Sequence, residues 1–378
     1  MTLRSESNED MDPPSASDPH LAPIASEGAL TLFHSRTPSP AFVAHIAKTE
    51  WGDTGLKVRS LDAAHELARL GEQDFYEVRD ATSRTVATYA LVARRLELGS
   101  HRIEARYRCL MSVDRSAGHS GVGTRLGRWI RELVVDRAHT PTLFYGFIDS
   151  ENPRSLAVAA RSGYRPLTHF HCVNIGWLAP GYLARKDPAV RRLRPHELDA
   201  ARTLLEAQRS AHAAPPLAHA LHYDELWGLF GPADRLLAVA QVVAKQVTVT
   251  SLPGKTGPLL RRIAPALAPL SGVFELRNRK VPWLCNLAAA PAPDRAELLA
   301  RLFRGIQRHT QSHGLVVYLH PTSPLNRELT AANAFGPLAR LSPPSRFEVM
   351  ADLAGPPSPI TWDSLSQAPW WFSPLESV

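Results

Sequence analysis

Hydrophobic and polar residues alternate in two distinct rhythms along the first half of the chain. Apolar side chains recur every three to four residues from Val122 through Leu126 to Leu133, which is the spacing of one helix face. Other segments alternate with a period of two, which is typical of strands. The pattern predicts strands at 55–62, 74–79, 85–95, 102–113, 142–148 and 170–176, and helices at 63–72, 122–134 and 153–162. These elements form a mixed α/β unit around a partly antiparallel sheet.

The same order of elements returns in the second half. We expect helices at 197–209 and 295–311, and strands at 246–252, 281–288, 315–320 and 345–353. Three short segments correspond between the halves: 108–110 with 284–286, 143–145 with 316–318, and 162–164 with 333–335. Because all three occur in the same order, they indicate an internal duplication. The predicted fold class is therefore α/β, with a mixed sheet in each of two tandem domains.

Proline clusters mark the tails and the connection between the two predicted domains. We expect a disordered N-terminal tail at 1–40, a first domain at 41–183, a second domain at 187–353 and a C-terminal tail at 354–378. Trp370, Trp371 and Phe372 lie in that last segment. We expect these aromatic residues to pack against one of the domains; a peptide that docks on a partner is the alternative.

Composition limits both the class of protein and the class of partner. The 378 residues include 43 lysines and arginines against 36 aspartates and glutamates, a net charge of +7 that suits either a polyanion or an anionic small molecule. No run of about 18 apolar residues occurs, so a membrane partner is not expected. The acidic N-terminus lacks the apolar core of a signal peptide, and three scattered cysteines do not form a disulfide framework. We therefore expect a cytoplasmic protein.

Two further patterns of charged or ligand-like residues are assigned no function. His169 and His171 lie on one face of a predicted strand, but no third ligand is spaced with them, so no metal site is predicted. Basic residues at 185–194 coincide with the predicted linker. A solvated charged surface is expected there, and a nucleic-acid partner is not.

A glycine-rich turn before the helix at 122–134 is the first pattern that carries chemistry. The turn reads Gly118-His119-Ser120-Gly121-Val122-Gly123-Thr124. A turn that leads into a helix exposes unpaired backbone N–H groups beside the positive end of the helix dipole, and glycines let a phosphate approach the backbone closely. The turn is therefore suited to hold a pyrophosphate. A tight connection without a ligand is the alternative.

A second element follows the next predicted strand. Asn152 is a good helix N-cap, and Pro153 suits the first helical turn. Gly163 ends the helix before Tyr164 returns the chain to a strand. With this element in place, the region 58–177 resembles the GNAT superfamily of acyl-CoA N-acyltransferases, which has a similar glycine turn and the same asparagine-to-glycine helix. The turn departs from the family pattern in that Gly118 replaces the Arg or Gln that usually opens it, and His119 replaces a glycine.

The resemblance implies an acyl-CoA co-substrate, which we expect to be acetyl-CoA. In the family, the fourth strand separates from the fifth to admit the pantetheine arm, and the pyrophosphate lies on the turn. Carried over residue by residue, the expected cofactor-binding residues are Met111, Ser112, Val113, Gly118, His119, Ser120, Gly121, Val122, Gly123, Thr124, Arg125, Asn152 and Ser155. An unidentified amine would then attack the thioester in the cleft between the two strands.

The chain departs from the family pattern at the catalytic positions. The tyrosine that protonates the leaving thiolate in many members is replaced by Ala159. The basic glutamate of other members falls near Tyr107, and the nearest carboxylate is Glu104. Tyr107 and Glu104 are therefore the remaining catalytic candidates. Acyl transfer can proceed without a dedicated acid and base when the amine is deprotonated and the thioester is well positioned.

The second predicted domain lacks a glycine turn. Prolines and Asp294 precede its helix at 295–311, and a pyrophosphate would meet missing N–H groups and a like charge there. We expect this repeat to be degenerate and to cover the first domain or to shape the acceptor pocket; a purely structural partner is the alternative. The predicted function is that of an acyl-CoA-dependent N-acetyltransferase. The altered catalytic positions leave an alternative, an acyl-CoA-binding sensor or scaffold without turnover.

Overall fold

The structure is a computed structural model of the whole chain. It describes residues 21–52, 57–114, 116, 121–176, 186–210, 212, 225–252, 257–267, 276–312, 314–336, 339 and 344–372. Among these residues, no helix combines the length and the apolar character that a membrane span needs.

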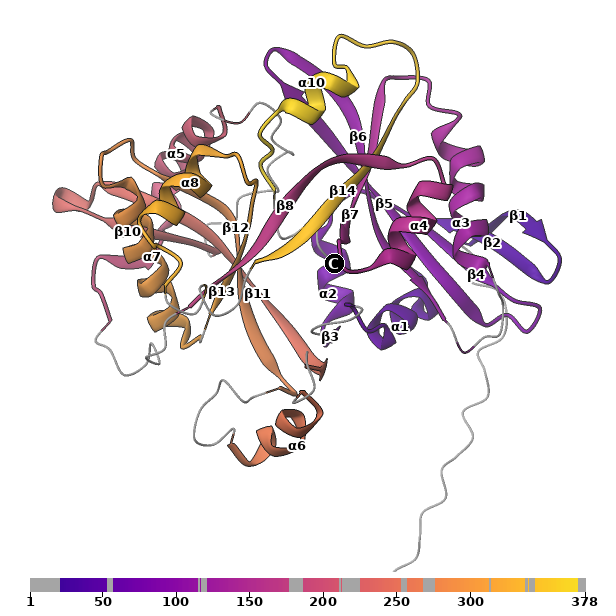
Figure 1. Cartoon of the computed structure of the whole chain (residues 1–378), viewed down its shortest axis with the longest axis horizontal. Helices are drawn as coiled ribbons and strands as arrows, with labels where there is room; N and C mark the ends of the chain where they lie inside the picture. The colour runs from indigo at the N-terminus through magenta and orange to yellow at the C-terminus, as the bar shows by residue number, and fades with distance from the viewer. Residues whose placement is uncertain are drawn as a thin grey trace, which may run out of the picture.

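One continuous mixed sheet connects the two halves of the chain (Figure 1). The first half contributes β1 (Ala22–Glu27), β2 (Leu30–Ser35), β4 (Gln73–Arg79), β5 (Thr85–Leu98), β6 (His101–Val113), β7 (Thr142–Asp149) and β8 (Arg165–Ile175). The second half contributes β9 (Val190–Arg192), β10 (Leu226–Phe230), β11 (Leu236–Ser251), β12 (Arg279–Ala289), β13 (Leu315–Leu319) and β14 (Ser345–Ala354). The strands follow the order β1-β2-β4-β5-β6-β7-β14-β8-β13-β12-β11-β10-β9, and β3 (Lys57–Ser60) pairs with β11.

Helices cover both faces of the first-half sheet. On one face lie α1 (Pro40–Lys48), α2 (Ala63–Arg69) and α10 (Trp362–Gln367), which bury Phe42, Leu67 and Leu365 in one core. On the other face lie α3 (Val122–Ile130) and α4 (Pro153–Arg161), which bury Leu126 and Ala159 in a second core. The second half adds α5 (Leu198–Ser210), α6 (Gly257–Leu267), α7 (Arg295–Thr310) and α8 (Pro324–Ala331).

The predicted duplication is visible in matching elements of the two halves. β6 and β7 run parallel around the crossover helix α3, and β12 and β13 run parallel around α7. The next helices begin alike, because Asn152 and Ser323 each cap a helix whose first residue is proline. They also end alike, with positive φ angles of 85° at Gly163 and 51° at Asn333. The predicted α/β fold with two tandem mixed-sheet units is confirmed.

The two halves exchange their last strands. β14 belongs to the second half, yet it lies between β7 and β8, and its antiparallel pairing with β7 runs from Phe347 to Ala354. β8 in turn pairs with β13 of the second half. In Figure 1 the yellow β14 crosses among the purple strands of the first half. Neither half therefore completes its sheet with strands from a contiguous stretch of chain. The domain limits 41–183 and 187–353 stay predictions.

The predicted tails require correction. A disordered segment up to residue 40 is wrong for residues 22–40, because β1 and β2 form a hairpin that extends the sheet from β4 and buries Leu30 and Leu32. Residues 1–20 lie outside the described residues. Residues 355–372 are also ordered: α10 forms, and Trp370 is 1% exposed in the core. The expectation that the C-terminal aromatic residues pack against a domain is confirmed.

Candidate functional site

β6 and β7 separate from one another partway along their length. Their parallel pairing runs from Glu104 opposite Thr142 to Tyr107 opposite Tyr145 and stops there. Beyond that point a bulge bends β6, because Leu110 has a φ of 55° and the register to β5 shifts. On its other edge, β7 pairs with β14 along its whole length, from Thr142 to Asp149. The result is a fork between two parallel strands, in the position that the sequence predicts for a pantetheine arm.

Gly146 lies at the start of the fork on β7. A Cβ atom there would lie 2.8 Å from the backbone oxygen of Arg108. The two strands therefore approach closely at the fork only because residue 146 has no side chain. Arg108 itself is held in place, since its guanidinium lies 4.2 Å from the ring centroid of Tyr164.

A cleft of about 1830 Å³ opens at the fork. Its walls come from both halves of the chain: from α1, β3, β6, β7 and the first turns of α3 and α4 on one side, and from β11, β12, β13 and the start of β14 on the other. Among the expected cofactor-binding residues, those that line it are Met111, Ser112, Val113, Gly121, Val122, Gly123, Thr124, Asn152 and Ser155. A cleft of this size has room for a cofactor and a second substrate.

The N-terminus of α3 points its backbone at this cleft. Gly121 is the N-cap in a left-handed conformation with a φ of 75°, which favours glycine. The first bond of the helix runs from the Arg125 N–H to the Gly121 oxygen, at 2.9 Å. Helix geometry thus leaves the N–H groups of Val122, Gly123 and Thr124 without an intrahelical acceptor. Gly118, His119 and Ser120 lie outside the described residues.

Arg125 does not line the cleft. Its Nε lies 3.3 Å from Oε1 of Glu27, and Arg128 from the next helical turn also pairs with Glu27. Glu27 of the hairpin strand β1 therefore neutralises the charge of Arg125, which the sequence analysis expected to contribute to cofactor binding. Asn152 and Ser155 meet at the start of α4, where the Ser155 N–H donates to the Asn152 side-chain oxygen at 3.0 Å.

Side chains of successive β6 residues beyond the bulge point to opposite faces of the sheet. Met111 and Val113 face α3, and their carbon atoms lie 3.7 and 3.4 Å from where a Cβ on Gly123 would be. Ser112 faces α1 instead. Its hydroxyl lies 3.1 Å from Nε2 of His45 and 2.8 Å from the hydroxyl of Thr49. Hydrogen bonds between these side chains thus connect α1 to β6 at the fork.

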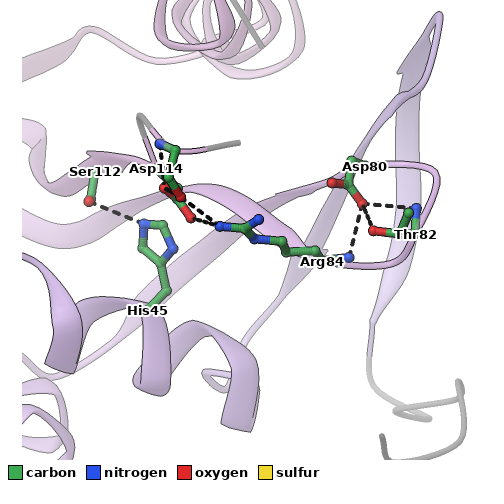
Figure 2. Close-up of polar contacts among 7 residues, drawn as sticks. His45, Asp80, Thr82, Arg84, Ser112 and Asp114 are labelled. Atoms are coloured by element: carbon green, nitrogen blue, oxygen red, sulfur yellow. Dashed lines mark hydrogen bonds and ion pairs between the residues drawn. The ribbon is translucent and has the colours of Figure 1, made fainter. Parts of the chain in front are cut away.

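His45 is a candidate functional residue that the sequence did not reveal (Figure 2). Burial lowers the pKa of its imidazole, although Asp114 nearby works in the opposite direction. Asp114 is itself engaged by Arg84 and by the hydroxyl and N–H of Ser116. His45 is therefore neutral at pH 7 and can accept a proton. No signal marked it, because it lies next to the residues expected to be a tail.

The two catalytic candidates from the sequence lie in different surroundings. Tyr107 lines the cleft and is 3% exposed, with its ring centroid 5.4 Å from that of Tyr145 and 5.2 Å from that of Phe147. Glu104 is exposed on β6 opposite Thr142 and does not line the cleft. Ala159 is buried in the core under α4. Of these positions, the structure places only Tyr107 beside the fork.

Burial suppresses the reactivity of a cysteine in the cleft. Cys172 lines the cleft, and burial raises the pKa of its thiol to about 12, so it is not a thiolate at neutral pH. His169 and His171 lie with ring centroids 5.8 Å apart. In the part of the chain that the structure describes, no three His, Cys, Asp or Glu residues are grouped so as to hold a metal ion.

Comparison with solved structures identifies the fold. Two structures of Saccharomyces cerevisiae N-myristoyltransferase with bound myristoyl-CoA superpose with TM-scores of 0.55 and 0.54 at 11% and 9% identity, covering 93% and 90% of this chain and 84% and 86% of theirs. A GCN5-related N-acetyltransferase (GNAT) from Sphaerobacter thermophilus gives 0.50 at 13% identity, covering 87% of this chain and 98% of that one.

The chain has a GNAT fold. No protein-family model and no curated protein sequence matches it. The similarity to the solved structures extends over both halves, so the second half is part of the shared architecture rather than an appended domain. In this GNAT fold, the fork between β6 and β7 and the N-terminus of α3 open into one cleft.

Proposed function

We propose that the protein transfers an acyl group from acyl-CoA to an amine. The observation that carries this proposal is the fork between β6 and β7, which opens beside the N-terminus of α3. Beyond Tyr107, β6 and β7 are not paired with each other in the described part of the chain, so their facing backbone can bind the amides of a pantetheine arm, and the helix N-terminus offers N–H groups to a pyrophosphate. A single extended cofactor satisfies both features.

The proposed contacts follow from this geometry. Backbone groups of Met111, Ser112 and Val113 hold the pantetheine arm, and the first turn of α3 from Gly121 to Thr124 holds the pyrophosphate. Gly118, His119 and Ser120 complete the phosphate turn in our proposal. Asn152 and Ser155 form the rim of the cleft at the start of α4. Arg125 is left out, because Glu27 engages it.

The residues of the cleft support a direct transfer. The amine nitrogen attacks the thioester carbonyl, a C–N bond forms and the C–S bond breaks. One proton must pass from the nitrogen to the departing sulfur. His45 is neutral, lines the cleft and can take this proton from the nitrogen, after which the thiolate recovers it. Asp114, which follows β6 at the fork, does not compete for this role, because Arg84 engages it.

We propose acetyl as the transferred group. The side chains beside the fork, Tyr107, Cys109 and Leu110, line the cleft and are each at most 6% exposed, so a short acyl chain would lie against a closely packed surface there. We also propose a cytoplasmic location, which suits the absence of a disulfide at Cys109, Cys172 and Cys285. The second half, in this proposal, shapes the acceptor side of the cleft.

Calorimetry with acetyl-, butyryl- and myristoyl-CoA, together with thiol release on a panel of amines, tests the proposal. The expected result is binding that Gly121→Glu abolishes and turnover that is fastest with acetyl-CoA. Failure of all three to bind would overturn the proposal. Tight binding without turnover on any amine would instead establish the acyl-CoA-binding sensor.

A further inference from the structure

The wall of the cleft opposite the fork is built by β11 and β12. Alternate residues of these paired strands point into the cleft: Lys245, Val247 and Val249 from β11, and Arg279, Val281 and Trp283 from β12. The wall is therefore apolar and contains two cations.

One of the two cations is balanced within the protein. The Lys245 ammonium is buried 4.1 Å from the ring centroid of Trp283, and Glu66 of α2 faces it across the cleft. Burial lowers the pKa of Lys245 and raises the pKa of Glu66, while each group partly offsets the shift of the other. Arg69 on the same helix pairs with Glu225 at 2.5 Å. These four groups form two opposite-charge pairs.

Arg279 has no counterion among the described residues. Among the residues that the structure describes, no carboxylate lies within ion-pair distance of its guanidinium. Burial alone lowers its pKa, and a guanidinium nevertheless stays charged at neutral pH. A half-buried cation without an anionic partner is unfavourable, and a planar guanidinium pairs best with a carboxylate. Binding of an anion beside Arg279 at this wall of the cleft would therefore be favourable.

We propose that this wall binds the amine acceptor, and that the acceptor carries a carboxylate held by Arg279 and an apolar body packed against Val281 and Trp283. The inference rests on the proposed acyl transfer and names the class of its second substrate. The carboxylate and the amine occupy opposite walls of the same cleft, so the acceptor spans it from Arg279 to the fork beside His45.

Matched acceptors test the proposal. Leucine, Leu-Leu and Leu-Leu-Leu are compared with their C-terminal amides, which differ by one carboxylate charge, and the length series measures the span from the amine to the cation. The acid-to-amide ratio of kcat/KM is measured in the wild type, in Arg279→Met and in Lys280→Met. Lys280 is the next residue of β12, is exposed and does not line the cleft, so it controls for the lost charge. Comparing ratios between variants cancels the different basicities of the amines.

The expected result is a ratio that falls at least tenfold in Arg279→Met for one acceptor length and less than twofold in Lys280→Met. An unchanged ratio in Arg279→Met would overturn the inference and leave the proposed function standing. A second arm measures acetyl-CoA affinity: a tenfold loss in Arg279→Met would assign this cation to the phosphates of CoA and overturn the inference too. No thiol release with any of these acceptors, while another amine of the panel is acylated, would overturn the inference alone. No thiol release with any amine would overturn the proposed function itself.

Discussion

Arg125 of α3 and Glu27 of β1 form an ion pair, with 3.3 Å between Nε and Oε1. The pair fixes the N-terminal hairpin against the first turns of the helix, because Arg128 engages the same carboxylate. It also removes a positive charge from the list of groups that could hold a phosphate. Anion binding at this helix must therefore rest on backbone N–H groups and on the conformation of Gly121.

Gly121→Val is expected to weaken acetyl-CoA binding at least tenfold. A β-branched residue at a φ of 75° costs about 1–3 kcal/mol and turns the first N–H groups of α3 away from the phosphates. Arg125→Ala should weaken binding by less than about fivefold, which corresponds to about 1 kcal/mol for a partly exposed ion pair. Calorimetry gives both affinities and thermal melting gives the stabilities. Equal losses in the two variants would contradict the backbone assignment.

His45→Gln is expected to lower kcat about a hundredfold and to remove one limb of the pH profile. The wild-type rate should fall as the pH drops through the pKa of His45, which lies below 6.5 because of burial, since only the neutral imidazole accepts a proton. Between pH 7 and 8 this group should leave the rate flat. His65→Gln, an exposed histidine on α2, is the control. A variant that keeps the acid limb would show that another group titrates.

His320 is expected to make the fold less stable in mild acid. Burial, and then the nearby His169, His212 and His171, lower its pKa from 6.5 to about 4. Below pH 6.5 His320 is protonated in the unfolded chain, whereas in the folded chain it is protonated only below about pH 4. The free energy of unfolding therefore falls across this window by up to about 3 kcal/mol. Urea unfolding from pH 7 to 4 measures the loss. His320→Gln should flatten that dependence, whereas the exposed His139→Gln should keep it.

Trp370→Ala is expected to destabilise the protein by about 3–5 kcal/mol, because a large buried aromatic side chain leaves a cavity. The indole N–H donates to the oxygen of Leu365 at 2.9 Å, and the ring lies 6.1 Å from that of Tyr145. Leu259→Ala, at a leucine that is 60% exposed, should change stability by about 0.5 kcal/mol or less. Chemical denaturation compares the two. A loss below 1 kcal/mol at Trp370 would mean that the C-terminal segment is dispensable.

Local signals were enough to predict the elements around the candidate site. Asn152, Pro153 and Gly163 specify the start and end of α4 within a few residues, and the structure has the same caps. Gly121 similarly specifies the turn into α3. Capping and turn chemistry depend on neighbours in the chain, so a single sequence carries them.

Pairings between distant segments could not be predicted in this way. The alternation in 345–353 indicated a strand and its buried face, but not that β14 lies between β7 and β8. Glu104 was chosen by its distance in sequence from Tyr107, whereas the register of β6 directs it out of the cleft. His45 and Arg279 became candidates only because of their surroundings in the folded chain. The sequence alone does not show which groups surround them.

The position of β14 has a consequence for how the molecule is made. During synthesis, β7 and β8 are both made long before β14, the strand that lies between them in the sheet. Until residues 345–354 emerge, β7 has no partner on that side and exposes the edge on which β14 later pairs. The first half thus waits for nearly the whole chain before its sheet is complete. Long-range strand pairing of this kind slows folding, and a nascent chain that pauses in the second half is exposed to aggregation through that edge.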